Sequence, residues 1–173
     1  MVNHKMVNIE RAEFPRDFQV VADLFLGYLN FLFERSPEER ELITKKYNPD
    51  HVDIHIKEFA QIHARPKGDL LIARYQGDPI GCGMMREMEP GIVEIQRVFV
   101  SSQSRGLGAG KMLTLALMDQ AREDGQETVR LDTGHALVEA CGLYEKLGFE
   151  ERSPYHQNTP YLDHLIKYYE RPL

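Results

Sequence analysis

The spacing of apolar residues in the first part of the chain predicts helices. Across residues 16–35 apolar positions recur every three or four residues, so this helix is apolar around most of its circumference. Ser36, followed by Pro37 and by Glu39 three positions on, is typical of a second helix start with a capping box. Asn48 predicts the start of a third helix, which runs to about residue 64.

From about residue 69 the hydrophobic residues tend to recur at every second position, which is typical of strands. Three strands separated by tight turns are predicted, and beyond them helices alternate with strands. In chain order the expected strands are 7–13, 69–75, 80–88, 92–100, 127–133, 148–152 and 164–170, and the later helices are 106–123 and 136–146. No repeat or linker interrupts this order, so we expect one α/β (α+β) domain over residues 1–173.

Composition narrows the classes of function. Of 173 residues, 42% are hydrophobic and 28% charged, as in ordinary globular proteins. The sequence has no basic cluster, which argues against nucleic-acid binding. Its net charge of −6 favours amine partners, because a negative field attracts cations. The most apolar stretch, residues 24–33, is about half the length of a membrane span, and the first residues lack a signal-peptide core. We therefore expect a soluble cytoplasmic protein.

The clearest chemical feature is the sequence RGLGAGK at residues 105–111, which follows a predicted strand and opens a predicted helix. Glycines let the backbone approach a ligand, and unpaired N–H groups at a helix start bind phosphate. A Walker A loop would need glycine at Arg105 and a hydroxyl at Met112, so it does not fit. A dinucleotide fingerprint would need glycine at Lys111 or Leu113, so it does not fit either.

The pattern that fits is R-x-x-G-x-G at Arg105, Gly108 and Gly110, directly after the strand VEIQRVFV. It resembles the acetyl-CoA loop of the GNAT superfamily, the GCN5-related N-acetyltransferases. A second segment, residues 140–150 with the sequence ACGLYEKLGFE, resembles that family's second signature. The resemblance implies a mixed, mostly antiparallel sheet of about six to seven strands flanked by about four to five helices.

The same resemblance implies where acetyl-CoA would bind. The pantetheine arm would lie between the strand that ends near residue 100 and its neighbour, and the pyrophosphate would lie on the glycine loop. The implied cofactor-binding residues are Val98, Phe99, Val100, Arg105, Gly106, Leu107, Gly108, Ala109, Gly110, Lys111, Ala140 and Leu143. No metal is expected, because the histidines around HVDIH at residues 51–55 lack the spacing of a known metal motif.

Two catalytic roles are also predicted. Tyr144, in the second signature, is expected to be the general acid that protonates the leaving CoA thiolate, because a tyrosine stays protonated at neutral pH. Glu94 is the first candidate for general base, with Asp132 second and His135 third. Under strict alternation Glu94 shares a face with Val98 and Val100, although a bulge between them would change that parity.

The expected function is direct transfer of an acetyl group to a primary amine of a small molecule or peptide. Neither Cys82 nor Cys141 lies where the family would need a nucleophile. The alternatives are a transferase for a longer acyl-CoA and a non-catalytic acyl-CoA-binding or sensory module. A homodimer through the apolar first helix or the C-terminal strands is compatible with the sequence, which identifies neither the acceptor nor the oligomeric state.

Overall fold

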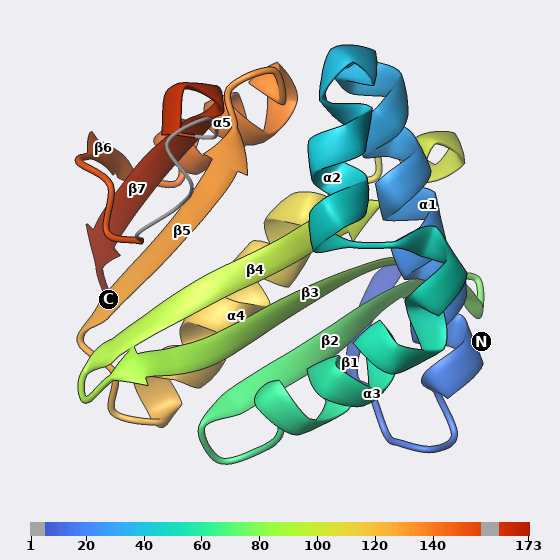
Figure 1. Cartoon of the computed structure of the whole chain (residues 1–173). Helices are drawn as coiled ribbons and strands as arrows, with labels where there is room; N and C mark the ends of the chain where they lie inside the picture. The colour runs from blue at the N-terminus through green and yellow to red at the C-terminus, as the bar shows by residue number, and fades with distance from the viewer. Residues whose placement is uncertain (1–5, 157–162) are drawn as a thin grey trace.

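Figure 1 shows a computed structural model that describes residues 6–156 and 163–173. In these ranges seven strands form one sheet, accompanied by five α-helices and four short 3-10 turns. The strands are β1 (Val7–Arg11), β2 (Gly68–Tyr75), β3 (Asp78–Glu89), β4 (Ile92–Val100), β5 (Thr128–Gly134), β6 (Glu150–Arg152) and β7 (Ile166–Pro172). The helices are α1 (Phe18–Arg35), α2 (Arg40–Lys46), α3 (Val52–Ile62), α4 (Ala109–Glu123) and α5 (Val138–Lys146).

The sheet has the strand order β1-β2-β3-β4-β5-β7-β6. Every neighbouring pair is antiparallel except β4 and β5, which run parallel because α4 connects them. This mixed, mostly antiparallel sheet confirms the predicted fold class. Across the described residues, no helix is both long enough and apolar enough to cross a membrane.

Helices cover both faces of the sheet, and each face has its own core. One core joins α4 and α5 to the sheet through residues such as Leu113, Leu117 and Tyr144. The other joins α1 and α3 to the opposite face through Phe25, Ile56 and Met84. In Figure 1 α4 lies behind the strands, whereas α1, α2 and α3 lie in front. The first helix is apolar around much of its circumference because it packs on both the sheet and α3.

Some predicted boundaries were wrong. Ser36 makes no side-chain cap, because a 3-10 turn at Pro37–Glu39 precedes α2 and moves the α-helical start to Arg40. The α4 helix begins at Ala109 instead of residue 106, since Gly106 and Gly108 have positive φ angles and form a loop. Asn48 also precedes a 3-10 turn, Pro49–His51, so α3 begins only at Val52; the Asn48 side chain does cap that turn, accepting a hydrogen bond from the Asp50 N–H at 3.0 Å.

His63, just after α3, is buried beneath the sheet and uncharged. Its Nδ1 donates to the Met85 carbonyl oxygen at 2.9 Å, and its Nε2 accepts from Arg97 Nη1 at 3.1 Å. Only 3% of the residue is exposed, and this burial, together with the nearby Arg97 and Arg86 charges, lowers the pKa of His63 to about 4. The unfolded chain therefore binds a proton at His63 at pH values where the folded chain does not.

The first prediction concerns stability in acid. Because the folded-state pKa of His63 lies below its ordinary value, stability is lost as the pH falls below about 6.5. Between pH 7 and pH 5 this single group should cost about 2 kcal/mol of unfolding free energy. Urea denaturation of wild type and His63→Gln at both pH values measures it. The variant should lose less stability on acidification, whereas His51→Gln, at an exposed histidine, should behave as wild type. Equal losses in all three proteins would show that His63 is not the group.

Candidate active site

Strands β4 and β5 pair along only part of their length. Their register runs from Ile92 opposite Thr128 to Ile95 opposite Leu131, and beyond this point the two strands have no mutual pairing. Figure 1 shows the two strands diverging toward the end of β5 from which α5 continues. The second half of β4 therefore has β3 on one edge and a gap on the other. Such a gap offers backbone N–H and C=O groups to an extended ligand.

A β-bulge lies in β4 where the gap opens. Cys82 lies opposite Phe99 and Met84 lies opposite Gln96, so two residues of β4 face one residue of β3. Arg97, one of the two, has φ +50°, which is the left-handed region. The interpretation based on strict alternation was therefore wrong. Past the bulge, the side chains of β4 point to the opposite faces from those that a regular strand would give them.

The bulge determines which face of the sheet each side chain of β4 occupies. A Cβ on Gly83 would lie 3.4 Å from Val98, and one on Gly110 would lie 3.7 Å from Val100, which places both valines on the α4 face. Phe99 points to the other face, with its ring centroid 5.7 Å from that of Tyr28 in α1. Glu94 lies on the α1–α3 face as well, where its neighbour Gln96 donates to its carboxylate. Glu94 therefore does not share a face with the two valines.

The predicted glycine loop forms a cradle at the start of α4. Gly106 (φ +86°) and Gly108 (φ +74°) both have left-handed backbones, and a Cβ on either would meet nothing within 4 Å. The first intrahelical hydrogen bond runs from the Met112 N–H to the Gly108 carbonyl at 3.0 Å, so the N–H groups before it have no partner in the helix. Arg105 is exposed, with its guanidinium 4.6 Å from the ring centroid of Phe31. The loop thus has the open backbone and positive end that a pyrophosphate requires.

The second signature lies beside this cradle. A Cβ on Gly110 would lie 3.8 Å from Leu143, so the loop and α5 are in contact. Tyr144 in α5 is 6% exposed, and its ring lies against those of Phe149 and Tyr169, with centroids 5.8 and 6.3 Å away. Burial is the main cause that raises the pKa of Tyr144 above its ordinary value, and the thiol of Cys141 and the carboxylate of Asp132 add to it. The phenol is therefore protonated at neutral pH.

On the α1–α3 face, three ionisable side chains meet at the mouth of the gap. The Glu94 carboxylate, with 1% of its side chain exposed, accepts a hydrogen bond from His156 Nε2. Asp132 Oδ2, from β5, lies 3.7 Å from the same nitrogen. On its other side Glu94 faces Arg86 Nε at 3.6 Å. Sequence reasoning missed His156, because it lies between the last two strands without a motif or a periodic pattern to mark it.

Aromatic rings and charges shape the electrostatics of this cluster. Burial, followed by the charge of Glu94, raises the pKa of Asp132. The phenol of Tyr155 is buried near the same two carboxylates, and its pKa is raised by burial first and by their charges next. Farther along the face, Arg97 donates from Nε to the Tyr47 hydroxyl at 3.0 Å. The α1–α3 face beside the gap thus carries two carboxylates with tyrosine rings nearby.

Other predicted candidates lie elsewhere. His135 is exposed, and its Nδ1 hydrogen-bonds to the Leu165 carbonyl at 3.0 Å. It is not part of the group formed by Glu94, Asp132 and His156, called the Glu94 cluster below. Over the described residues, the histidines of HVDIH form no group of three metal-ligating side chains, whereas Glu94, Asp132 and His156 do lie within 4.8 Å of one another.

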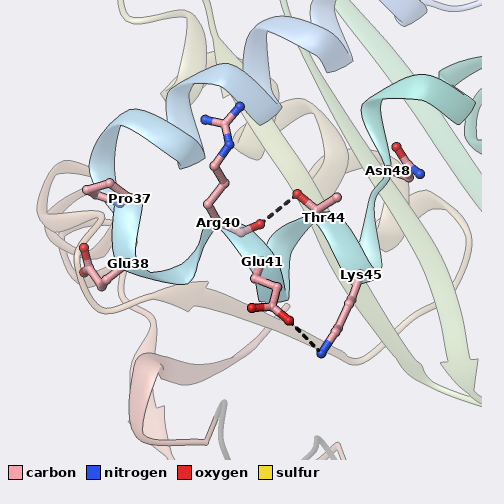
Figure 2. A pocket seen from close by; sticks show the side chains of 7 residues that line it. All are labelled: Pro37, Glu38, Arg40, Glu41, Thr44, Lys45 and Asn48. Atoms are coloured by element: carbon pink, nitrogen blue, oxygen red, sulfur yellow. Dashed lines mark hydrogen bonds and ion pairs between the residues drawn. The ribbon is translucent and has the colours of Figure 1, made fainter.

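A separate surface hollow borders α2 and carries no such chemistry. Figure 2 shows that its side chains come from the 3-10 turn before α2, from α2 itself and from Asn48. Within it Lys45 pairs with Glu41 at 3.3 Å, and the Thr44 hydroxyl donates to the Arg40 carbonyl at 2.8 Å. These groups satisfy one another in the manner of a solvated helix face, so the hollow is not a candidate active site.

Comparison with known proteins agrees with this geometry. A model of the acetyltransferase (GNAT) family matches residues 30–149, which include the β4–β5 gap, the glycine loop and the second signature. The chain belongs to this family. That membership confirms the resemblance inferred from the two motifs and the prediction of an acetyltransferase that uses acetyl-CoA.

Curated relatives carry the same activity class in their names. The chain is 35% identical over 114 residues to an IAA acetyltransferase of Azospirillum brasilense, which covers 65% of this chain and 73% of the relative. It is 36% identical over 101 residues to the N-acetyltransferase YjgM of Escherichia coli, covering 57% of this chain and 60% of that one. An N-acetyltransferase of Schizosaccharomyces pombe is 27% identical over 165 residues, or 91% of each chain.

Solved structures share the fold at low sequence identity. The PaiA N-acetyltransferase of Thermoplasma acidophilum, determined in complex with coenzyme A, has a TM-score of 0.74 at 17% identity and covers 96% of this chain and 99% of its own. A GCN5-related N-acetyltransferase of Kribbella flavida has a TM-score of 0.71 at 18% identity and covers 96% of this chain and 98% of its own. These likenesses support the fold alone.

The second prediction tests the glycine cradle. A valine at Gly108 would be strained by the positive φ and would place a side chain in the cradle, so Gly108→Val should bind acetyl-CoA at least 10-fold more weakly. Gly77→Val, in the β2–β3 turn, is the matched control. Gly77 also has a positive φ of +91°, and a Cβ added there would meet nothing within 4 Å. Calorimetric titration and thermal melting of both variants separate strain from binding. Both should melt at lower temperature than wild type, and only Gly108→Val should lose affinity. Wild-type affinity in Gly108→Val would exclude the cradle as the pyrophosphate site.

Proposed function

We propose that the protein transfers the acetyl group of acetyl-CoA directly to a primary amine of a small molecule or peptide. The observation that best supports this function is the separation of β4 from β5 beside the glycine cradle. An extended pantetheine chain fits along the free edge of β4, with the pyrophosphate on the cradle. The thioester then lies where the α4 face and the α1–α3 face meet, between Tyr144 and the Glu94 cluster.

Tyr144 acts as the general acid. When the amine attacks, the C–S bond breaks and the CoA sulfur leaves as a thiolate that needs a proton. Burial keeps the Tyr144 phenol protonated, and a phenol is a stronger donor than water in such a dry site. A backbone N–H on the free part of β4 can polarise the thioester carbonyl, as an oxyanion-hole donor does.

Removal of the proton from the amine belongs to the Glu94 cluster on the other face. An acceptor amine is an ammonium ion in neutral water, and the carboxylates of Glu94 and Asp132 attract such a cation. The phenols of Tyr155 and Tyr28 are close enough to Asp132 to feel its charge, so both rings adjoin this region. The cluster thus both attracts the acceptor and converts it to a nucleophile.

A covalent acyl-enzyme on cysteine is disfavoured by burial. Cys82 is 2% exposed, and burial raises the pKa of its thiol to about 12, so it stays an unreactive thiol. Cys141 is 7% exposed, with its Sγ 3.9 Å from the Gly134 carbonyl oxygen. Direct attack of the amine on the thioester needs neither side chain.

The third prediction tests the general acid. Tyr144→Phe removes one hydroxyl, so kcat should fall about 100-fold while the affinity for acetyl-CoA stays within a few-fold of wild type. Thiol release with an active amine and calorimetric titration measure the two quantities. Tyr169→Phe is the matched control, because that hydroxyl is also in a buried residue but bonds Glu145 Oε1 at 3.0 Å. Wild-type kcat in Tyr144→Phe would remove the tyrosine from the mechanism.

The same assay tests the function as a whole. Wild type that binds acetyl-CoA but releases no CoA with any of a broad panel of amines would identify a binding or sensory module instead. Tighter binding and faster turnover of a longer acyl-CoA would identify a different acyl donor.

The fourth prediction concerns direct transfer. The double variant Cys82→Ala and Cys141→Ala should keep kcat within about threefold of wild type, because no thiol carries the acetyl group. Steady-state thiol release measures kcat, and intact-protein mass after incubation with acetyl-CoA alone detects a covalent acyl-enzyme. An added acetyl mass in wild type that is absent from the double variant would contradict direct transfer.

A further inference from the structure

Both oxygens of the Glu94 carboxylate are engaged within the protein, and the side chain is shielded from solvent. With 1% of its side chain exposed, it accepts hydrogen bonds from Gln96 Nε2 on one oxygen and from His156 Nε2 on the other. A carboxylate that is enclosed in this way cannot take a proton from an amine by direct contact. The His156 side chain, which contacts this carboxylate, is 26% exposed.

The hydrogen bond to Glu94 also fixes the protonation of the histidine ring. An ionised carboxylate only accepts hydrogen bonds, so His156 Nε2 must carry the proton that it donates. In the neutral imidazole the lone pair is then on Nδ1, which has no hydrogen bond to any of the described residues. A histidine that is oriented by a carboxylate through one nitrogen, with no partner for the other among the described residues, has the arrangement of a general base.

We propose that His156 is the general base of the amine acetylation and that Glu94 and Asp132 are the residues that position it and stabilise its charged form. The proposal rests on the proposed function and deepens it. Glu94 bonds the imidazole directly, and Asp132 Oδ2 lies 3.7 Å from the same nitrogen, so the imidazolium lies between two negative charges. The base predicted at Glu94 thus acts through its neighbour.

The ammonium group gives one proton to His156 Nδ1, and the freed lone pair of the amine forms the C–N bond with the thioester carbon. The C–S bond then breaks, and the sulfur takes a proton from Tyr144. The amide nitrogen loses its second proton, which restores the phenol through solvent. One proton leaves per turnover, from His156 to water.

Charged and ionisable groups from several elements lie near His156. Glu94 on β4 and Asp132 on β5 are the nearest charges, and Tyr155 lies beside it with ring centroids 4.6 Å apart. Arg86 on β3 reaches Glu94 from the other side at 3.6 Å. The farther charges that act on Asp132 are Lys46 and Arg97. The two carboxylates lie closer to His156 Nε2 than these positive groups do.

The fifth prediction tests the base with the full-length enzyme and an amine shown to release CoA with wild type. His156→Gln should lower kcat/KM for that amine about 100-fold at neutral pH and remove the acid limb of its pH profile. The affinity for acetyl-CoA should stay within a few-fold of wild type. His164→Gln is the matched control, because His164 is an exposed histidine in the 3-10 turn Asp163–Leu165. This variant should behave as wild type.

A second substrate separates a base from a structural residue. With a weakly basic, fluorinated alkylamine that is neutral at the assay pH, no proton needs to be removed before attack. The ratio of wild-type to His156→Gln rates should therefore fall at least 10-fold relative to the ratio with the ammonium substrate. An equal loss with both amines would mean that His156 only holds the site together, and the proposal would be wrong.

Glu94→Gln tests the positioning role. Removing the negative charge beside the imidazolium should shift the acid limb of the kcat/KM profile to lower pH, and the rate on the alkaline side should fall less than in His156→Gln. An unshifted limb would contradict the role of Glu94.

The same experiments distinguish other failures. Activity that is abolished by EDTA and restored by Zn²⁺ would show that Glu94, Asp132 and His156 bind a metal instead of acting as a base. If wild type released no CoA with any amine, the proposed function itself would have failed. An active wild type with His156→Gln unchanged would overturn only the assignment of the base.

Discussion

The β-bulge at Arg97 is the feature on which the arrangement of this site depends. Without the extra residue in β4, Glu94 and Val98 would point to the same side of the sheet. With it, Val98 and Val100 pack toward α4 and the glycine loop, and Glu94 points toward α1 and α3. The two valines and the glycine loop thus lie on one face and the Glu94 carboxylate on the other, with the β4–β5 gap between them.

The bulge is itself held in place by side chains from distant parts of the chain. Arg97 donates to His63 Nε2 at 3.1 Å and to the Tyr47 hydroxyl at 3.0 Å, and its guanidinium lies 4.1 Å from the centroid of the Phe59 ring. His63 can accept that bond because burial keeps it uncharged, and its other nitrogen bonds the Met85 carbonyl of β3. The end of α3, the loop after α2 and the third strand therefore all fix the same left-handed residue. The low pKa of His63 is a consequence of this arrangement.

Much of the fold could be predicted because its signals are local. The glycine at position 108 is required by a positive φ at the start of α4, and the motif that contains it follows a strand whose apolar pattern is plain. Tyr144 could be named as a candidate for the same reason, since it belongs to a contiguous signature, and its role as the acid stays a prediction. Boundaries were less accurate at Ser36, where a 3-10 turn precedes α2 and the serine makes no cap. Local sequence does not distinguish a first α-helical turn from a 3-10 turn.

The sequence by itself determined the family, the glycine loop and the candidate acid, because each depends on residues that are neighbours along the chain. Only the tertiary structure decided which face Glu94 occupies and what it touches. A bulge changes side-chain parity without leaving a signature in the residues that form it. Likewise His156 is separated from Glu94 by 62 positions, and nothing in its own segment indicates that β4, β5 and the last connection bring it onto two carboxylates. The sequence could therefore name a carboxylate, but the contact of His156 with that carboxylate is a product of packing between segments distant in the chain.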